Sequence, residues 1–284
     1  MKKKLLALLL GLTLCLSLAA CGGDSAADSG AADTGAAEEG GDSGETVTLT
    51  VAASPTPHAV ILEQCVPILA EQGIDLVINQ YSDYVVPNTA VEDGDEDANY
   101  FQHLPYLEEF NETRGTHLVS VAGVHIEPMG IYAGKTASLD ELADGAVIGI
   151  PNDPTNEGRA LLLLEAQGLI TLDDSSNLSA TPNNIVDNPK NLQFEEIEAQ
   201  TLPSSRPDLD LAVINSNYAL GAGLNPTTDA LAIESGDSPY VNVLVVKEGN
   251  EDNPAIQALV EALHSDTIRD FINEEFDGAV VPAF

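Results

Sequence analysis

Three polar residues open a predicted helix in the middle of the chain. The apolar run 146–150 predicts a strand, and Asp153 and Pro154 after it suit the N-cap and first turn of a helix. Asn156 and Arg159 then lie three residues apart on one helical face, close to the positive helix end. An amide and a guanidinium in this place could bind an anion, because the planar arginine fork matches a carboxylate. The alternative is a solvated arginine on an amphipathic helix.

Aromatic side chains gather in two short segments, 81–84 and 100–106, of a chain that contains no tryptophan. Both segments follow predicted strands, where loops face a cleft. Rings there could wall a pocket for an apolar or thioether group, since sulfur packs favourably against aromatic rings. The alternative is ordinary filling of the core. The candidate wall residues are Tyr84, Phe101, His103 and Tyr106.

Two asparagines lie at the ends of predicted strands. Asn215 follows the buried-looking run 211–214, and Asn242 lies at the start of the apolar run 241–246. Asn215 would cap a helix by default, because asparagine is a favoured capping residue. Either amide could instead donate and accept hydrogen bonds at a ligand.

Metal binding and catalysis receive little support from the sequence. Imidazole and carboxylate groups suit zinc or manganese, and the candidates are His58, His103, His125 and Glu127. Their spacing is wide, so we expect no metal and no cofactor. There is no Gly-x-Ser-x-Gly elbow and no paired-histidine zinc helix, and Cys65 lies in a helical apolar pattern. We therefore expect a protein that is not an enzyme.

The pattern that must position these residues is an alternation of strands and helices. It starts at residue 47 and predicts α/β architecture with parallel sheets. A second series of strands and helices begins with 130–133, and the strand 241–246 with the helices after it would return to the first. Two lobes joined by two crossover strands would leave a cleft at the strand ends, where ligands of open α/β sheets bind.

The amino terminus predicts export and a lipid anchor. Three lysines precede the apolar run 5–18, and Leu18-Ala19-Ala20-Cys21 follows. This is typical of a secretory signal over residues 1–20, with Cys21 as the residue that receives a diacylglycerol. An ordinary signal peptide that happens to contain Cys21 is the alternative. The segment 21–46, rich in small and acidic residues, predicts a flexible tether, and the formal net charge of −36 argues against nucleic-acid binding.

These windows together resemble the NlpA family of methionine-binding lipoproteins, the receptor components of methionine ABC importers. The resemblance covers nearly everything from residue 47 onward. The matching segments are SDYVVPN (82–88), DANYFQHLPYLEEFN (97–111), HIEPMGIY (125–132), IPNDPTNEGRALLLLEAQGLI (150–170), NPKNL (188–192), LAVINSNYA (211–219) and SPYVNVLVV (238–246).

The resemblance implies a two-lobed periplasmic-binding-protein fold of type II, with two crossover strands as a hinge. Lobe 1 would comprise 47–128 and 242–284, and lobe 2 would comprise 129–241. The implied ligand is free methionine, delivered to a membrane permease driven by an ATPase, with the protein lipid-anchored on the extracytoplasmic face of the membrane. A methionine-containing dipeptide or another apolar amino acid is the alternative ligand, and a metal receptor is a more distant one.

Specific residue roles also follow from the resemblance. Arg159 and Asn156 would hold the ligand carboxylate, and Asn215 and Asn242 its other backbone atoms, chiefly the ammonium group. The side chain would be enclosed by Tyr84, Phe101, His103 and Tyr106. No carboxylate of the chain is assigned to the ligand ammonium.

Overall fold

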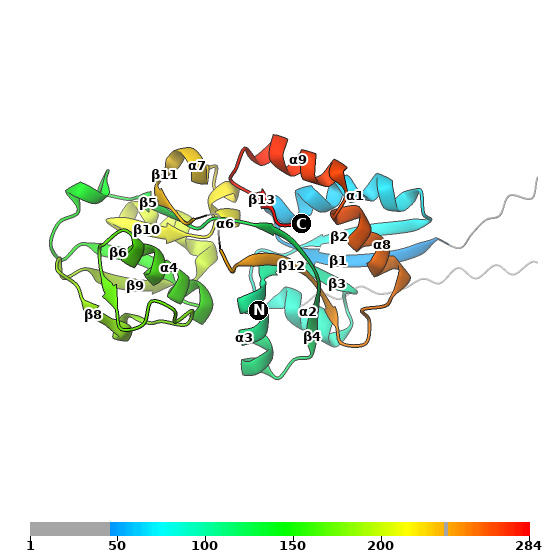
Figure 1. The fold of residues 1–284 in the computed structure, drawn as a ribbon, viewed down its shortest axis with the longest axis horizontal. Helices are drawn as coiled ribbons and strands as arrows, with labels where there is room; N and C mark the ends of the chain where they lie inside the picture. Colours follow the sequence, from blue (N-terminus) through cyan, green and yellow to red (C-terminus); the bar gives the residue numbers. More distant parts are fainter. Residues whose placement is uncertain (1–45, 236–237) are drawn as a thin grey trace, which may run out of the picture. The chain divides into compact units, whose positions relative to one another are not determined.

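Two β-sheets organise the computed structural model, which describes residues 46–235 and 238–284 (Figure 1). These residues belong to one compact unit, Gly44–Phe284. The predicted signal peptide, Cys21 and all but the last residue of the predicted tether lie outside the described residues. No helix in the described part of the chain combines the length and apolar character needed to cross a bilayer.

The first sheet has six strands in the order β13-β4-β12-β3-β1-β2. Its strands are β1 (Val47–Ala53), β2 (Ile74–Gln80), β3 (Ala98–His103), β4 (Leu118–Ile126), β12 (Val241–Lys247) and β13 (Val281–Pro282). The helices around it are α1 (Val60–Ala70), α2 (Val86–Asp93), α3 (Leu104–Arg114), α8 (Pro254–Leu263) and α9 (Asp266–Phe276), and the π-helical turn η1 (Pro55–Ala59) precedes α1.

Side chains on β12 show why this sheet is covered on both faces. Leu244 and Val246 pack in the core formed with α1, α8 and α9, whereas Val243 and Val245 pack with residues of α2 and α3. Successive side chains of a strand point to opposite faces, so an uninterrupted apolar run requires a layer of helices on each side. Figure 1 shows α1, α8 and α9 on one side of the sheet and α2 and α3 on the other.

The second sheet has five strands in the order β11-β5-β10-β6-β9. They are β5 (Gly130–Ala133), β6 (Val147–Pro151), β9 (Gln193–Ile197), β10 (Leu211–Ile214) and β11 (Ala230–Ile233). Its main helices are α4 (Pro154–Ala166), α5 (Leu202–Ser205), α6 (Ser216–Gly221) and α7 (Pro226–Asp229), and a separate two-stranded sheet pairs β7 (Thr171–Leu172) with β8 (Ile185–Asp187). Leu211 and Val213 of β10 pack in the cluster that contains α4, and Ala212 and Ile214 pack with Leu202 of α5.

The expectation of parallel sheets is correct only in part. β1 pairs parallel with β2 and β3, and β6 pairs parallel with β9 and β10. β12, however, runs antiparallel to β3 and β4, and β5 runs antiparallel to β10 and β11. The physical reason for the direction of β12 is the path of the chain. β12 starts where the chain enters the first sheet from the second, so it runs away from the boundary between the sheets, whereas β3 and β4 run toward it.

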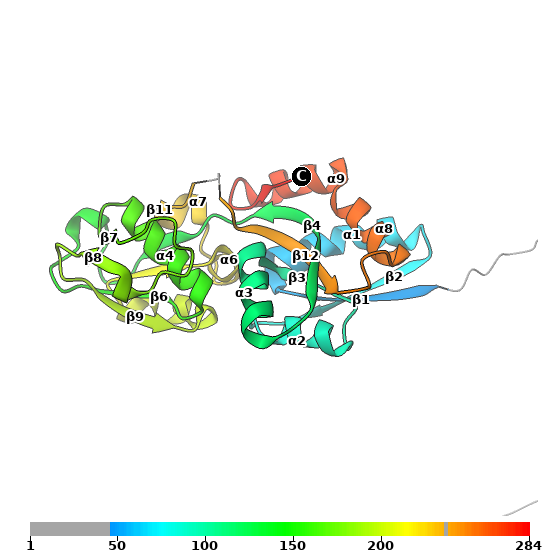
Figure 2. The same cartoon turned by 60° about the horizontal axis from the view of Figure 1, so that its bottom comes forward.

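The chain passes between the two sheets twice, after β4 and again before β12. The strands of the first sheet come from 47–126 and 241–282, and those of the second from 130–233. Where the lobes meet, α6 packs against η1 and α3 against α4. Figure 2 shows α3 and α6 near this boundary.

Candidate functional site

A cavity lies between the two sheets, at the ends of their strands. About 340 Å³ of its space, part of it open to solvent, is not filled by protein atoms. Its lining residues are Tyr84, Phe101, Gln102, His103, Tyr106, Glu127, Asn156, Arg159, Asn215, Ser216, Asn217 and Asn242. All of them except Tyr84 are at most 7% exposed. The structure thus brings together around one cavity all eight residues that the sequence proposed for a ligand.

Helix α4 positions two of these residues through its first turn. Asp153 is its N-cap: Oδ1 accepts hydrogen bonds from the main-chain N of Asn156 at 3.0 Å and from Nδ2 of Asn156 at 2.9 Å. A Cβ atom at Gly158 would lie 2.3 Å from the carbonyl oxygen of Leu178. Only glycine therefore lets this helix approach that loop so closely, and the approach fixes where Asn156 and Arg159 enter the cavity.

The guanidinium of Arg159 is held by groups from other parts of the chain. Its Nε lies 3.0 Å and 3.1 Å from the two carboxylate oxygens of Glu234, and its Nη2 lies 2.5 Å from Oε2 of the same residue. Nη2 also donates to the main-chain oxygen of Glu127 at 2.7 Å, and the group stacks 4.2 Å from the ring centroid of Tyr240. Among the described residues, Nη1 has no hydrogen-bond partner, so this nitrogen can donate to a ligand. Sequence reasoning missed Glu234.

Asn156 lies at the centre of an amide network rather than facing the cavity alone. Its Oδ1 accepts from Nδ2 of Asn215 at 2.7 Å and from Nε2 of His103 at 3.1 Å. The Nδ1 atom of His103 accepts from the main-chain N of Tyr106, so the ring proton is on Nε2. Burial is the main reason why the pKa of His103 is lowered to about 3, and the nearby positive charge of Arg159 is the second. This imidazole is therefore neutral and fixes the orientation of the Asn156 amide.

Three rings form the apolar wall of the cavity. The ring centroid of Tyr84 lies 5.9 Å from that of Phe101 and 5.8 Å from that of Tyr106, and the latter two are 6.2 Å apart. The hydroxyl of Tyr84 donates to Oδ1 of Asn217 at 2.6 Å, and the hydroxyl of Tyr218 donates to the main-chain oxygen of Ser82 at 2.9 Å. These two bonds join the first lobe to the second beside the aromatic wall.

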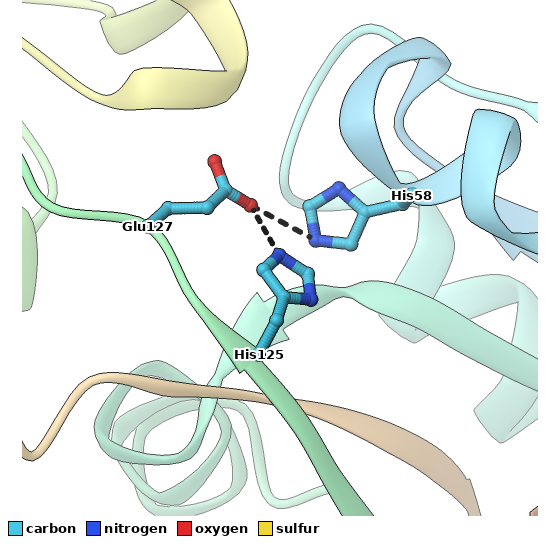
Figure 3. Close-up of side chains that lie close together, drawn as sticks. All are labelled: His58, His125 and Glu127. Carbon is cyan, nitrogen blue, oxygen red and sulfur yellow. Dashed lines mark hydrogen bonds and ion pairs between the residues drawn. The ribbon is translucent and has the colours of Figure 1, made fainter. Parts of the chain in front are cut away.

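A second buried cluster contains three of the four residues considered for a metal (Figure 3). Oε1 of Glu127 lies 2.8 Å from Nε2 of His125 and 3.3 Å from Nε2 of His58. His58 comes from η1 and His125 from the end of β4, and Glu127 follows β4 directly. His103 does not belong to this cluster, because its Nε2 faces Asn156. Of the three, Glu127 also lines the cavity.

Burial shifts the pKa values of this cluster toward neutral side chains. It lowers the pKa of His58 to about 4 and that of His125 to about 3. Burial is also the largest influence on Glu127 and raises the pKa of its carboxyl. Both imidazoles are therefore neutral donors near pH 7, so any charge in the cluster lies on Glu127.

Comparison with known proteins places this geometry in a family. The sequence profile of the NlpA lipoprotein family matches residues 49–284. The chain is 42% identical over 270 residues to the methionine-binding lipoprotein MetQ of Bacillus subtilis, covering 93% of each protein.

Solved structures of lipoproteins and substrate-binding proteins are also similar to this chain. A putative lipoprotein of Ruminococcus gnavus is 52% identical with a TM-score of 0.82, covering 84% of this chain and 99% of that one. A periplasmic substrate-binding protein of an ABC transporter from Coxiella burnetii is 42% identical with a TM-score of 0.79, covering 83% and 100%. A nutrient-binding protein of Burkholderia cenocepacia, solved with methionine bound, is 40% identical with a TM-score of 0.79, covering 84% and 100%.

These likenesses confirm the α/β, two-lobed periplasmic-binding fold expected from the sequence. Several of the relatives carry names of binding proteins, and one is named for its ABC transporter. With a family profile that matches nearly the whole described region, the chain belongs to the NlpA lipoprotein family.

Proposed function

We propose that this protein is the lipid-anchored receptor of a methionine importer, which binds free methionine between its lobes and delivers it to an ABC permease. The observation that carries the proposal is the cavity, because it combines one buried guanidinium, several amides and an aromatic wall. These groups suit the carboxylate, the ammonium and the thioether of one amino acid. The methionine-bound relative from Burkholderia cenocepacia, with a TM-score of 0.79, supports the same ligand.

The proposed roles follow from the hydrogen-bonding atoms of each residue that are not already used by contacts within the described part of the protein. Nη1 of Arg159 would donate to the ligand carboxylate, since Nε and Nη2 already bind Glu234 and the main chain. Asn215 and Asn242 would contact the backbone atoms of the ligand, and Asn156 would orient Asn215 while it contacts the carboxylate. The thioether chain would lie against Tyr84, Phe101, His103 and Tyr106.

The lobes would close around the ligand as two bodies, 47–128 with 242–284 and 129–241. The chain passes between them after β4 and again before β12, and a few residues in such connections can absorb a hinge motion. The protein would perform no chemistry. It would act from the extracytoplasmic face of the membrane, anchored at Cys21, and hand methionine to a permease driven by a cytoplasmic ATPase.

Titration calorimetry on refolded protein tests this function, after denaturation has removed any ligand carried through purification. We expect saturable binding of L-methionine at one site, and weaker binding of leucine, which lacks sulfur to pack on the rings. Tighter binding of a methionine-containing dipeptide or of another apolar amino acid would favour that alternative instead. Absence of heat with L-methionine and D-methionine would overturn the proposal.

A further inference from the structure

Strand β3 contains one residue more than its neighbour β12 pairs with. Along this antiparallel ladder Gln102 lies opposite Val243, and Tyr100 lies opposite the next residue of β12, so the pairing skips Phe101. An extra residue of this kind is a β-bulge, which bends the strand and turns the side chains beside it to new directions. The bulge lies at the cavity, because Phe101, Gln102 and His103 all belong to the cavity lining.

The bulge places two consecutive side chains on one face of the sheet. Tyr100 packs in the core that α1, α8 and α9 form on one side, and Phe101 packs with aromatic residues of α3 on the other. In a regular strand Gln102 would return to the side of Tyr100. Its amide instead bonds to Asn88 of α2, on the side of Phe101. Gln102 and, after it, His103 therefore lie on the faces opposite to those that an uninterrupted strand would give them.

Three buried amides hold this arrangement, and we call Asn88, Asn99 and Gln102 the amide network. Nδ2 of Asn88 donates to Oε1 of Gln102 at 2.9 Å, and Nε2 of Gln102 donates to Oδ1 of Asn88 at 2.5 Å. Nε2 of Gln102 also donates to Oδ1 of Asn99 at 2.9 Å. Nδ2 of Asn99 donates to Oδ1 of Asn88 at 2.9 Å and to the main-chain oxygen of Pro87 at 3.3 Å. Asn88 and Asn99 are completely buried, and Gln102 is 4% exposed.

The amide network has no donor at the cavity that a ligand could use. Gln102 lines the cavity, but both N–H bonds of its Nε2 are used within the network. Asn88 and Asn99 are not among the described residues of the cavity lining. Burying amides in place of apolar side chains is costly unless they are hydrogen-bonded, and a fully bonded network fixes one arrangement of the elements that carry it. The network therefore acts on geometry.

The aromatic wall of the cavity depends on this geometry. Phe101 lies in β3 between two members of the network, and Tyr84 lies four residues before Asn88, just ahead of α2. The hydroxyl of Tyr106 donates to the main-chain oxygen of Tyr84 at 3.0 Å, so the third ring is tied to the same segment. A shift of α2 against β3 would move Tyr84 relative to Phe101 and change the shape of the wall.

The polar side of the cavity depends on the bulge through His103. Nε2 of His103 lies 3.1 Å from Oδ1 of Asn156, which belongs to the other lobe. If the pairing of β3 slipped by the one residue that the bulge adds, His103 would turn to the opposite face of the sheet and lose this contact.

We infer that Asn88, Asn99 and Gln102 are positioning residues that determine ligand selectivity: they maintain the bulge at Phe101 and thereby set the shape of the aromatic wall and the place of His103. The inference rests on the proposed function and adds to it the residues that decide which side chain the cavity prefers. Asn88 and Asn99 act through Phe101 and His103 and do not touch the ligand.

The test compares wild type with Asn88→Ala in calorimetric titrations with L-methionine and L-ethionine, which is longer by one methylene. A well-formed apolar pocket discriminates between side chains that differ by one methylene by about 10–200-fold. A wall without a fixed position loses much of this discrimination. We therefore expect the ratio of the ethionine to the methionine dissociation constant to fall at least about fivefold in the variant.

Asn111→Ala is the matched control. The amide of Asn111, on α3 in the same lobe, also takes part in three hydrogen bonds, with Thr116 and Leu118, and it lies outside the described cavity lining. This variant should lower the melting temperature and leave the ratio of dissociation constants unchanged. An unchanged ratio in Asn88→Ala, or an equal fall in both variants, would overturn the inference, because the amide network would then only stabilise the fold.

A double-mutant cycle tests whether Asn88 acts through Phe101. In protein that already carries Phe101→Leu, the further change Asn88→Ala should alter the ratio less than about twofold, because residues that act as one unit have non-additive effects. Fully additive effects of the two substitutions would contradict the proposed path.

The imidazole of His103 gives a readout that needs no ligand. Burial is the main reason why its pKa is lowered to about 3. In Asn88→Ala we expect this pKa, measured by NMR titration, to rise toward the ordinary value of about 6.5, because the ring loses its buried place. An unchanged pKa would overturn the inference. A wild type that binds no methionine would refute the proposed function instead, so the two failures are distinguishable.

If Asn88→Ala does not fold, Asn99→Ala replaces it in these measurements. This variant keeps the reciprocal pair of Asn88 and Gln102 and loses the bonds of one amide only. We expect a smaller change in the same direction, with a fall of at least about twofold in the ratio. An unchanged ratio with an unchanged pKa of His103 would overturn the inference.

Discussion

Arg159 and Glu234 form a bidentate ion pair, although 75 residues separate them in the sequence. Glu234 therefore occupies the planar fork of the guanidinium that the sequence suggested for a ligand carboxylate. The pair is nearly buried: the Arg159 side chain is 3% exposed and that of Glu234 17%. A ligand that enters the cavity meets an arginine already fixed in place, with Nη1 as its available nitrogen.

Replacing Glu234 by glutamine should lower the stability of the ligand-free protein. It should also increase the stabilisation that bound methionine provides. The variant leaves a buried guanidinium without its carboxylate, which we expect to lower the free energy of unfolding by roughly 1–3 kcal/mol, below the 3–5 kcal/mol of a fully buried pair. A ligand carboxylate would replace the missing charge, so methionine should raise the melting temperature more than in wild type. Thermal unfolding with and without methionine measures both effects.

Glu92→Gln is the control for this change. Glu92 is 21% exposed and pairs with Lys247, but it does not line the cavity. An unchanged melting temperature in Glu234→Gln, together with an unchanged methionine shift, would mean that the Arg159–Glu234 pair contributes nothing to the site.

Replacing Arg159 by alanine should weaken methionine binding about 30-fold to several-thousand-fold. Loss of one partner of a buried charged contact costs roughly 2–5 kcal/mol, and each 1.4 kcal/mol is tenfold in affinity. Arg159→Lys should recover little, because a point charge on a flexible stem cannot bind Glu234, the Glu127 carbonyl and a ligand together. Calorimetric dissociation constants check this, with Arg269→Ala as control, since Arg269 pairs with Asp266 on α9. Equal, small losses in Arg159→Ala and Arg269→Ala would refute the role of Arg159.

Three histidines should stay neutral in the folded protein well below pH 6. Burial lowers the pKa of His58 to about 4 and the pKa values of His103 and His125 to about 3. In the unfolded chain each titrates near 6.5. As the pH falls below 6.5, the unfolded state gains protons that the folded state does not, so each histidine lowers stability, by about 1.4 kcal/mol one pH unit below that value.

The measurement is an NMR titration of the imidazole signals in folded protein and in protein denatured with urea. Glu127 shifts stability in the opposite direction, because burial raises its pKa and the folded state then binds the extra proton. Melting temperatures alone would mix the two effects. Signals assigned to His58, His103 or His125 that titrate near pH 6.5 in the folded protein would contradict the buried, neutral arrangement.

Replacing Cys21 by serine should release the protein from membranes. A diacylglyceryl group provides two chains and holds a protein firmly, whereas a single acyl chain binds only marginally. Fractionation of cells that produce wild type and Cys21→Ser checks this, and Cys15→Ser, within the predicted signal, is the control that should stay in the membrane fraction. Retention of Cys21→Ser would contradict the lipid anchor.

The sequence predicted the buried strands well because their apolar runs are continuous. β5 and β10 have the bounds that the sequence indicated. Strand β11 was missed, since its run of four apolar residues is short and two of the four are alanines, which are depleted in strands. The direction of β12 was also missed, because a period of two residues shows that a strand is buried but not which way it runs.

The candidate site was predictable where its residues lie next to strands. His103 ends β3, Asn215 follows β10 and Asn242 lies in β12, so each has a local signal. Glu234 has none, since its partner Arg159 is distant in sequence and only the fold brings them together. Glu127 was considered only as a metal ligand, because its position at the cavity depends on where the chain leaves β4.

The hydrogen bonds from Tyr84 to Asn217 and from Tyr218 to Ser82 set a limit on how quickly a bound molecule can leave. Both bonds cross from one lobe to the other beside a cavity whose lining is otherwise almost completely buried. Opening of the lobes would require both bonds to break, so the rate of lobe opening would be an upper bound on the rate of ligand release. L-methionine and D-methionine should therefore share one upper bound on their escape rates, however different their affinities. A transporter that draws the lobes apart would shorten the residence time without competing for a single contact inside the cavity.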